Sequence, residues 1–172
     1  MSKLDIVIGT IDTAGGVFGA VVTPQGLARL TFASEPLSWC QTWVDRWWPE
    51  ANLVADDGRM QPVTEQLQAF FRGELRQFSL DLDMQGTPFQ REVWQALQQI
   101  PFGQTCSYAD IANRIGRPKA VRAVGRANGA NPVPIVVPCH RVIGKSGALV
   151  GYAGGLELKQ RLLELEGLVT NE

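Results

Sequence analysis

Apolar residues near the start of the chain alternate in short segments that predict a small sheet. The segments 4–10, 17–23 and 27–32 are rich in Val, Ile, Thr and Phe, and glycine and proline residues between them supply the turns. Two helices are predicted after these strands. The first spans about 37–48, beginning near Ser38 and stopping before Pro49, and the second runs from near Pro62 to about Phe71.

Four tryptophans occupy the first predicted helix at a spacing of about four residues, which places them on one helical face. This spacing is typical of core packing, and we expect no separate function for them. The four residues are Trp39, Trp43, Trp47 and Trp48.

A domain boundary is predicted at residues 84–87, which separate an N-terminal domain (1–83) from a C-terminal domain (88–172). Thr87 can cap a helix that starts with Pro88, and Gln90 would complete a capping box. Apolar residues then recur at helical spacing as far as about residue 99. This segment therefore predicts a helix with one buried face.

A second cap signature, at Ser107, predicts a short helix to about residue 115, and a glycine-containing turn leads to another helix at 119–128. Two short helices joined in this way are typical of a helix-turn-helix unit. Lys119, Arg122 and Arg126 would share one face of the second helix. Its other side chains, such as Ala123, are small, which suits either close approach to a DNA minor groove or close helix packing.

Charge and composition narrow the function classes. Residues 111–156 contain seven basic residues and no acid, although the net charge of the whole chain is −1. This segment would attract a polyanion, whereas a solvated face usually mixes both signs. No apolar run is long enough to span a membrane, and we expect no secretory leader, because only Lys3 precedes a very short apolar segment. Three widely spaced cysteines predict a cytoplasmic protein with reduced thiols.

The most reactive pair in the sequence is Cys139 next to His140, the only histidine. Prolines in the preceding segment, 131–138, exclude a regular helix and predict an extended, buried segment. A thiol and an imidazole can act as nucleophile and base, but adjacent side chains do not normally face each other, so a bridging water or a turn is needed. A short helix starting at Cys139, with Arg141 and Lys145 nearby, would favour the thiolate.

The motif at 138–144, taken together with Asn131-Pro132, the glycine-rich segment 151–155, Ser107-Tyr108 and Arg122-Ala123-Val124-Gly125, resembles the signature of O6-alkylguanine-DNA alkyltransferases. These repair proteins are also called methylated-DNA–protein-cysteine methyltransferases. The resemblance covers about residues 87–167. It implies an α/β (α+β) protein with a ribonuclease-H-like N-terminal domain and a winged-helix-like C-terminal domain that carries the helix-turn-helix.

The resemblance also implies a reaction in which Cys139 takes the alkyl group irreversibly in a single turnover. His140 would remove the thiol proton through a water, Glu166 would orient His140, Tyr108 would donate to the base, and Asn131 would brace the site. The flipped guanine would lie against the carbonyls of Cys139 and Val142 and against a wall formed by Tyr152, Ala153 and Gly154.

The implied partner is double-stranded DNA that carries O6-alkylguanine, chiefly O6-methylguanine, and that is bound through its minor groove. O4-methylthymine would be a second substrate. Arg122 would fill the vacated stack, Lys119 and Arg126 would hold phosphates, and Ala123 would lie against the groove. We expect no cofactor and no contact with a membrane. We expect the protein to be a monomer. Some relatives bind zinc in the N-terminal domain, but this chain has no histidine there, so no metal is expected.

Two alternatives stay open at this level. A non-catalytic module could bind alkylated guanine and recruit other factors, although proteins of that kind replace the cysteine. A cysteine hydrolase could use Cys139, His140 and an acid, but it would have no use for a basic helix-turn-helix.

Overall fold

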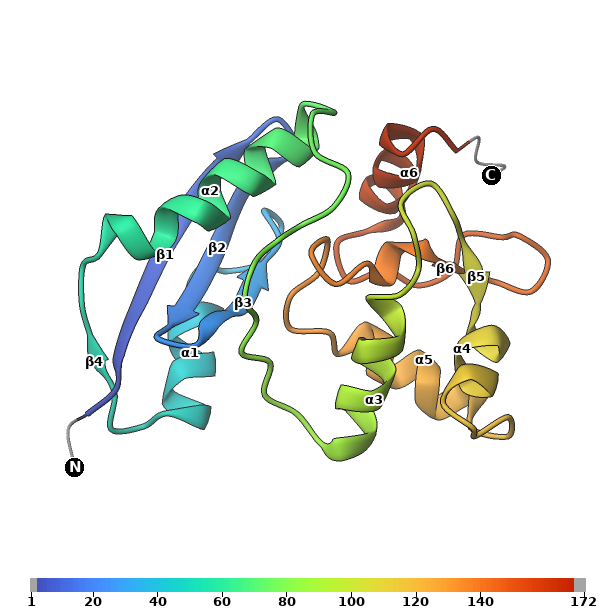
Figure 1. Ribbon diagram of the computed structural model, residues 1–172, viewed down its shortest axis with the longest axis horizontal. Coiled ribbons are helices and arrows are strands. Elements are labelled where there is room, and N and C mark those ends of the chain that lie inside the picture. The colour runs from blue at the N-terminus through green and yellow to red at the C-terminus, as the bar shows by residue number, and fades with distance from the viewer. Residues whose placement is uncertain (1–2, 169–172) are drawn as a thin grey trace. The chain divides into compact units, whose positions relative to one another are not determined.

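The computed structural model describes residues 3–168. The chain forms two compact units, Met1–Gln85 and Gly86–Glu172, and their division falls inside the segment 84–87 that was predicted as a linker. The first unit contains a sheet with helices, and the second is mainly helical (Figure 1). The predicted mixed α/β fold class is therefore confirmed. Among the described residues, every helix is too short or too polar to cross a bilayer.

The sheet of the first unit has four strands in the order β3-β2-β1-β4. The strands β1 (Asp5–Thr13), β2 (Gly16–Thr23) and β3 (Gly26–Thr31) form an antiparallel meander, which confirms the three predicted strands. The fourth strand, β4 (Asn52–Leu53), pairs in parallel with β1. It was missed in the sequence because two exposed residues are too few to show alternation.

Helices α1 (Ser38–Trp47) and α2 (Asp57–Phe71) cover opposite faces of this sheet (Figure 1). Ile6 and Val21 belong to one buried cluster with Cys40 and Val44 of α1. Neighbouring strand positions face the other way, where Gly9 leaves room for Met60 of α2. Alternation along the strands therefore buries both faces.

The prediction that these four tryptophans pack in the core was confirmed only in part, because Trp48 packs against the buried cluster formed by α1 and the sheet. Trp39 is 45% exposed, and the buried residues of α1 are Cys40 and Val44. The other indoles lie at the edge of the core, where Arg29 stacks over Trp43 at 5.0 Å and Arg46 over Trp47, also at 5.0 Å. Both indoles are partly buried, and cation–π contact with these guanidinium groups adds to that packing.

The prediction that α2 starts near Pro62 was also wrong, because α2 begins at Asp57 and contains Pro62 in its interior. The side chain of Asp56 caps the helix by accepting a hydrogen bond from the Arg59 amide at 3.1 Å. Pro62 has no N–H to donate to the turn before it, and α2 tolerates this single missing bond.

In the second unit, α3 (Pro88–Leu97) and α4 (Tyr108–Arg114) both begin with the predicted capping boxes, at Thr87 and Ser107. Helix α5 (Val121–Gly129) packs against both, and the indole of Trp94 donates to the Ala127 carbonyl at 2.8 Å. The predicted helix pair is thus present. Lys119, however, lies in the turn before α5, so its predicted place on that helix was wrong.

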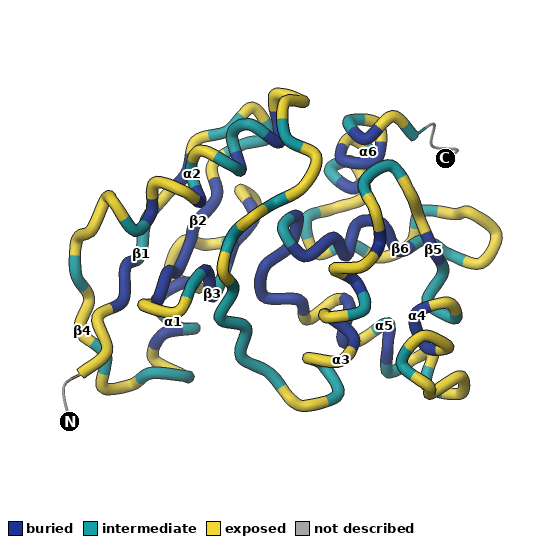
Figure 2. Tube along the Cα trace, in the orientation of Figure 1, coloured by how far each residue is buried: buried dark blue, intermediate teal, exposed yellow. Residues whose placement is uncertain are grey.

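The segment before Cys139 is buried as predicted, but it is not extended (Figure 2). It folds into a tight turn in which Pro134 forms a bridge with Val137, and Ile135 adopts a left-handed conformation with φ 75°. The turn leads into a short 3-10 helix, η1 (Cys139–Arg141), and then into β6 (Val142–Ile143), which pairs in parallel with β5 (Cys106–Ser107). Helix α6 (Leu156–Leu165) completes this unit.

Candidate active site

Asn131 fixes the turn that presents Cys139. Its side-chain amide donates to the Val137 carbonyl at 2.8 Å and its oxygen accepts from the Val133 amide at 3.0 Å. The Cys139 amide donates to the same Val137 carbonyl at 2.8 Å. Because these bonds are buried, they hold the backbone that leads into Cys139.

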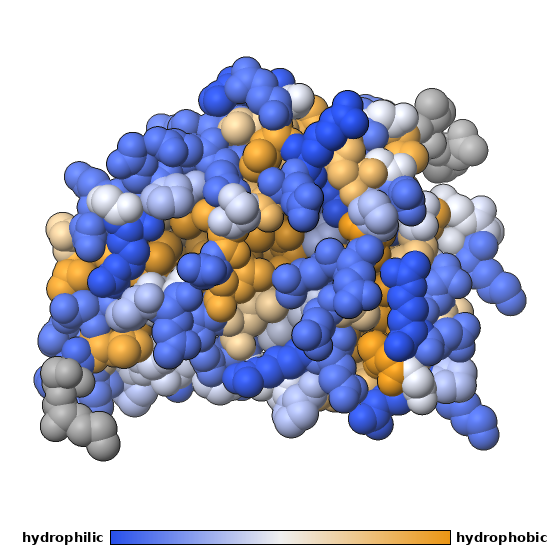
Figure 3. Space-filling model, viewed as in Figure 1, coloured by the Kyte–Doolittle hydropathy of each residue, from blue (hydrophilic) through white to orange (hydrophobic). Residues whose placement is uncertain are grey.

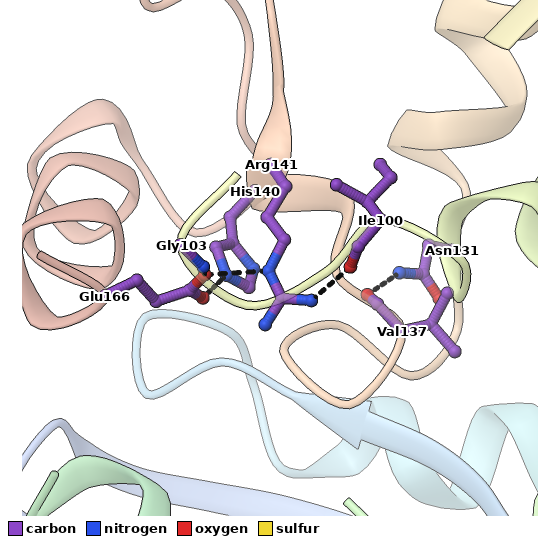
Figure 4. A network of polar contacts seen from close by, with 7 residues as sticks. All are labelled: Ile100, Gly103, Asn131, Val137, His140, Arg141 and Glu166. Carbon is purple, nitrogen blue, oxygen red and sulfur yellow. Dashed lines mark hydrogen bonds and ion pairs between the residues drawn. The ribbon is translucent and has the colours of Figure 1, made fainter. Parts of the chain in front are cut away.

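His140 and Arg141, which follow Cys139 in the chain, form a buried polar network with Glu166 (Figure 4). The His140 Nε2 atom lies 2.5 Å from Glu166 Oε2, so the contact expected between these residues is present. Glu166 Oε1 accepts from Arg141 Nε at 2.8 Å and from the Gly103 amide at 2.9 Å. One carboxylate therefore satisfies three donors in a site with almost no solvent.

The protonation states follow from this geometry. Burial lowers the pKa of His140, although the hydrogen bond and charge of Glu166 oppose the shift. For Glu166, burial acts to raise the pKa, but hydrogen bonds and charge from His140 and Arg141 outweigh it and lower the pKa. An ionised carboxylate can only accept, so a neutral His140 carries its proton on Nε2 and has a free lone pair on Nδ1. That Nδ1 atom is buried and has no protein partner among residues 3–168.

The stability of the protein is expected to fall as the pH drops from 7.5 to 5.5. His140 is the only histidine, and its lowered pKa means that the folded state resists a proton that the unfolded state accepts near 6.5. Stability present above pH 6.5 is therefore lost as the pH falls. Urea unfolding midpoints across this range measure the effect. His140→Gln should flatten the pH dependence, and an equally steep curve in that variant would contradict the assignment.

The Cys139 thiol is protonated at rest. It is 5% exposed, and burial raises the pKa of the thiol to about 11, against the opposing effects of Asn131, Lys159 and Tyr152. Arg141 is engaged by Glu166, and Lys145 is exposed. The predicted thiolate stabilisation by Arg141 and Lys145 was therefore wrong, and a base must remove the proton during the reaction.

Two tyrosines connect the cysteine to its surroundings. Tyr108, the first residue of α4, is half-buried, and burial followed by the nearby Cys139 raises the pKa of its hydroxyl. A side chain at Gly125 of α5 would lie 3.9 Å from the Tyr108 ring, so this ring lies beside α5. Tyr152 is partly buried in the turn that contains Ala153 and Gly154, and the Gly155 amide closes this turn on the Tyr152 carbonyl at 2.9 Å.

The basic residues predicted to contact DNA are on the surface. Arg122 and Arg126 are exposed on α5 four residues apart, Ala123 between them is partly buried, and Lys119 is exposed in the preceding turn. The face of this unit seen in Figure 3 is mainly hydrophilic. Within residues 3–168 no cluster of three or more His, Cys, Asp or Glu side chains could hold a metal ion, and the three cysteines are free and buried.

Sequence reasoning missed Lys159, which is fully buried in α6. It precedes Leu162, Leu163 and Glu166 by three, four and seven residues, which is the spacing of one helical face. A lysine in line with the apolar positions of a helix was the available signal. The sequence could not predict the hydrogen bond from Gly103 to Glu166, because its donor is a backbone amide that every residue except proline carries.

The fold and site define a class of protein: a mixed α/β chain whose helix-turn-helix unit carries a buried thiol next to a buried histidine–carboxylate pair. Residues 88–168 match the family described as 6-O-methylguanine DNA methyltransferase, DNA binding domain. A constitutive methylated-DNA–protein-cysteine methyltransferase of Bacillus subtilis is 52% identical over 166 residues, covering 93% of this chain and 96% of that protein. The chain belongs to the methylated-DNA–protein-cysteine methyltransferase family.

Further relatives and solved structures agree with this membership. The inducible Bacillus subtilis methyltransferase is 46% identical over 150 residues, covering 87% of this chain and 84% of that protein. The crystal structure of Mycobacterium tuberculosis O6-methylguanine methyltransferase has a TM-score of 0.79 at 43% identity, covering 94% of this chain and 92% of that one. A structure of the Mycobacterium tuberculosis protein in complex with DNA matches with the same TM-score and coverage at 42% identity.

Proposed function

We propose that this protein repairs O6-alkylguanine in double-stranded DNA by transferring the alkyl group to the sulfur of its own Cys139. The observation that carries the proposal is the buried thiol beside His140, whose Nε2 is bound by Glu166 at 2.5 Å. Family membership supports it, because the relatives are named for this transfer. A DNA complex of a relative supports DNA as the partner.

The transfer needs only groups that the chain supplies. His140 Nδ1 takes the thiol proton through a water, and Glu166 stabilises the resulting imidazolium. The thiolate attacks the alkyl carbon in line, a sulfur–carbon bond forms, and the bond from that carbon to O6 breaks. The electron pair stays on the guanine, which gains one proton for the one that the thiol lost. The thioether is stable, so each molecule reacts once.

Guanine is a better leaving group when hydrogen-bond donors stabilise the negative charge that develops on it. We assign Tyr108 a hydrogen bond to the base and the Ala153 amide one to O6, and both residues lie in segments that border the cysteine. The carbonyls of Cys139 and Val142 would accept from the guanine amino group. Tyr152 and Gly154 would complete the wall of the pocket, and O4-methylthymine would be a second substrate.

The alkylated base lies inside a duplex and must be flipped out, at a cost of a few kcal/mol. Arg122, exposed on α5, would enter the vacated stack, and Lys119 and Arg126 would contact phosphates. The small Ala123 would let the helix approach the minor groove. This assignment makes α5 the DNA-reading helix of a monomeric repair protein.

A duplex with a radiolabelled methyl group on guanine O6 tests the proposal. We expect one label per protein molecule, located on the Cys139 peptide by mass spectrometry, and no further transfer when more DNA is added. Label that stays on tightly bound DNA would indicate a binding module instead. Label released as a small molecule over repeated turnovers would indicate a hydrolase.

A further inference from the structure

Lys159 carries a charge into the interior of the second unit. Its side chain is fully buried, and its Nζ atom donates to the Val142 carbonyl at 2.7 Å and to the Val150 carbonyl at 2.9 Å. Both partners are neutral, although a buried ammonium normally requires a negative charge nearby. Cys139 is the acidic group whose charge interacts with Lys159.

The two carbonyls belong to opposite ends of the loop beside the cysteine. Val142 starts β6 directly after η1, and Val150 immediately precedes the glycine-rich turn that contains Tyr152. The Lys159 ammonium group of α6 therefore binds both of these segments through their carbonyls. A carbonyl oxygen has two lone pairs, so Val142 can bind Lys159 and still accept from a second donor.

We propose that Lys159 is a positioning residue for the acceptor cysteine: it fixes the Val142 and Val150 carbonyls around the site, and its ammonium stabilises the negative charge that develops on Cys139 sulfur. The second part deepens the proposed function, since it explains how a buried thiol ionises. A lysine with only a packing role would not need to be charged.

The other charged groups near the site do not replace Lys159. From η1, Arg141 is paired with Glu166, and His140 receives the thiol proton in the proposed transfer. From α6, Glu166 is engaged by both of these residues. Burial lowers the pKa of Lys159 to about 8, while Cys139 acts in the opposite direction. Lys159 is therefore charged at neutral pH and loses its effect on the thiolate as the pH rises above about 8.

Alkylation of Cys139 by iodoacetamide, followed on its peptide by mass spectrometry from pH 6 to 11, tests the charge directly. In Lys159→Met, we expect Cys139 to react about 10-fold more slowly at pH 7, where Lys159 is charged in the wild type, and the two rates to converge above about pH 8, where Lys159 loses its charge. Lys159→Arg should restore part of the rate. Arg161→Met, which removes an exposed cation from the same helix, should match the wild type.

A folded Lys159→Met protein whose Cys139 reacts at the wild-type rate at pH 7 would overturn the proposal. If that variant does not fold, Lys159→Gln keeps a donor without the charge and must show the same slow alkylation. The probe needs no DNA, so the result can be read even if methyl transfer from DNA is not found. The failure of the proposed function and the failure of this inference are thereby distinguishable.

Discussion

Replacement of Glu166 by alanine is expected to lower the free energy of unfolding by about 3–5 kcal/mol, the usual cost of leaving a buried ionic partner uncompensated. The variant removes the acceptor of three buried donors, from His140, Arg141 and the Gly103 amide. Arg141 would keep only its bond to the Ile100 carbonyl and would remain charged in a buried site. Urea denaturation at pH 7.5 measures the change.

The matched control is Glu164→Ala on the same helix. Glu164 is exposed and accepts a hydrogen bond from Gln160 at the surface, so its loss should change stability by less than about 0.5 kcal/mol. Glu166→Gln, which keeps the shape but not the charge, should fall between the two. Equal midpoints for Glu166→Ala and Glu164→Ala would refute the assigned role of the network.

The Cys139→Ala protein is expected to transfer no methyl group while it still binds methylated DNA. Removal of a covalent nucleophile from an enzyme costs on the order of 10⁶-fold in rate, and here the acceptor atom itself is gone. DNA binding should persist because the proposed contacts of Arg122 and Arg126 lie on the surface of α5. Label transfer and a gel-shift titration on the same duplex separate the two properties.

Cys106→Ala provides the control for this experiment. Cys106 is another buried free cysteine of the same unit, but it lies in β5 and outside the polar network. This variant should still accept one methyl group per molecule. Transfer by Cys139→Ala, or label found on Cys106 in the wild type, would show that the acceptor was wrongly assigned.

Local signals predicted the elements whose cause is local. The capping boxes at Thr87 and Ser107 were predicted correctly because cap, helix start and reciprocal side chain lie within four residues. The predictions failed where tertiary contacts determine whether a side chain is buried. The four tryptophans fit a buried stripe by spacing, but only Trp48 packs against the buried cluster beside Cys40 and Val44, and arginines cover Trp43 and Trp47.

The active site shows the same division. Residue types and their order identified Cys139 and His140 as the reactive pair, and the resemblance to a family supplied Glu166. The source of positive charge near the thiol was assigned wrongly to Arg141 and Lys145, because sequence proximity was taken for spatial proximity. The charge comes instead from Lys159, 20 positions away along the chain, through a helix that packs against η1.

The sequence by itself determined the helix pair, the acid-free basic segment and the adjacent Cys139–His140 pair that we propose as nucleophile and base, because each depends on residue type and short spacing. Only the tertiary structure decided how His140 is protonated and which cation interacts with the thiol. Both depend on burial and on partners 17 to 26 residues distant, such as Val142 for Lys159 and Glu166 for His140. Burial makes each of these contacts strong, and burial is a property of the folded chain.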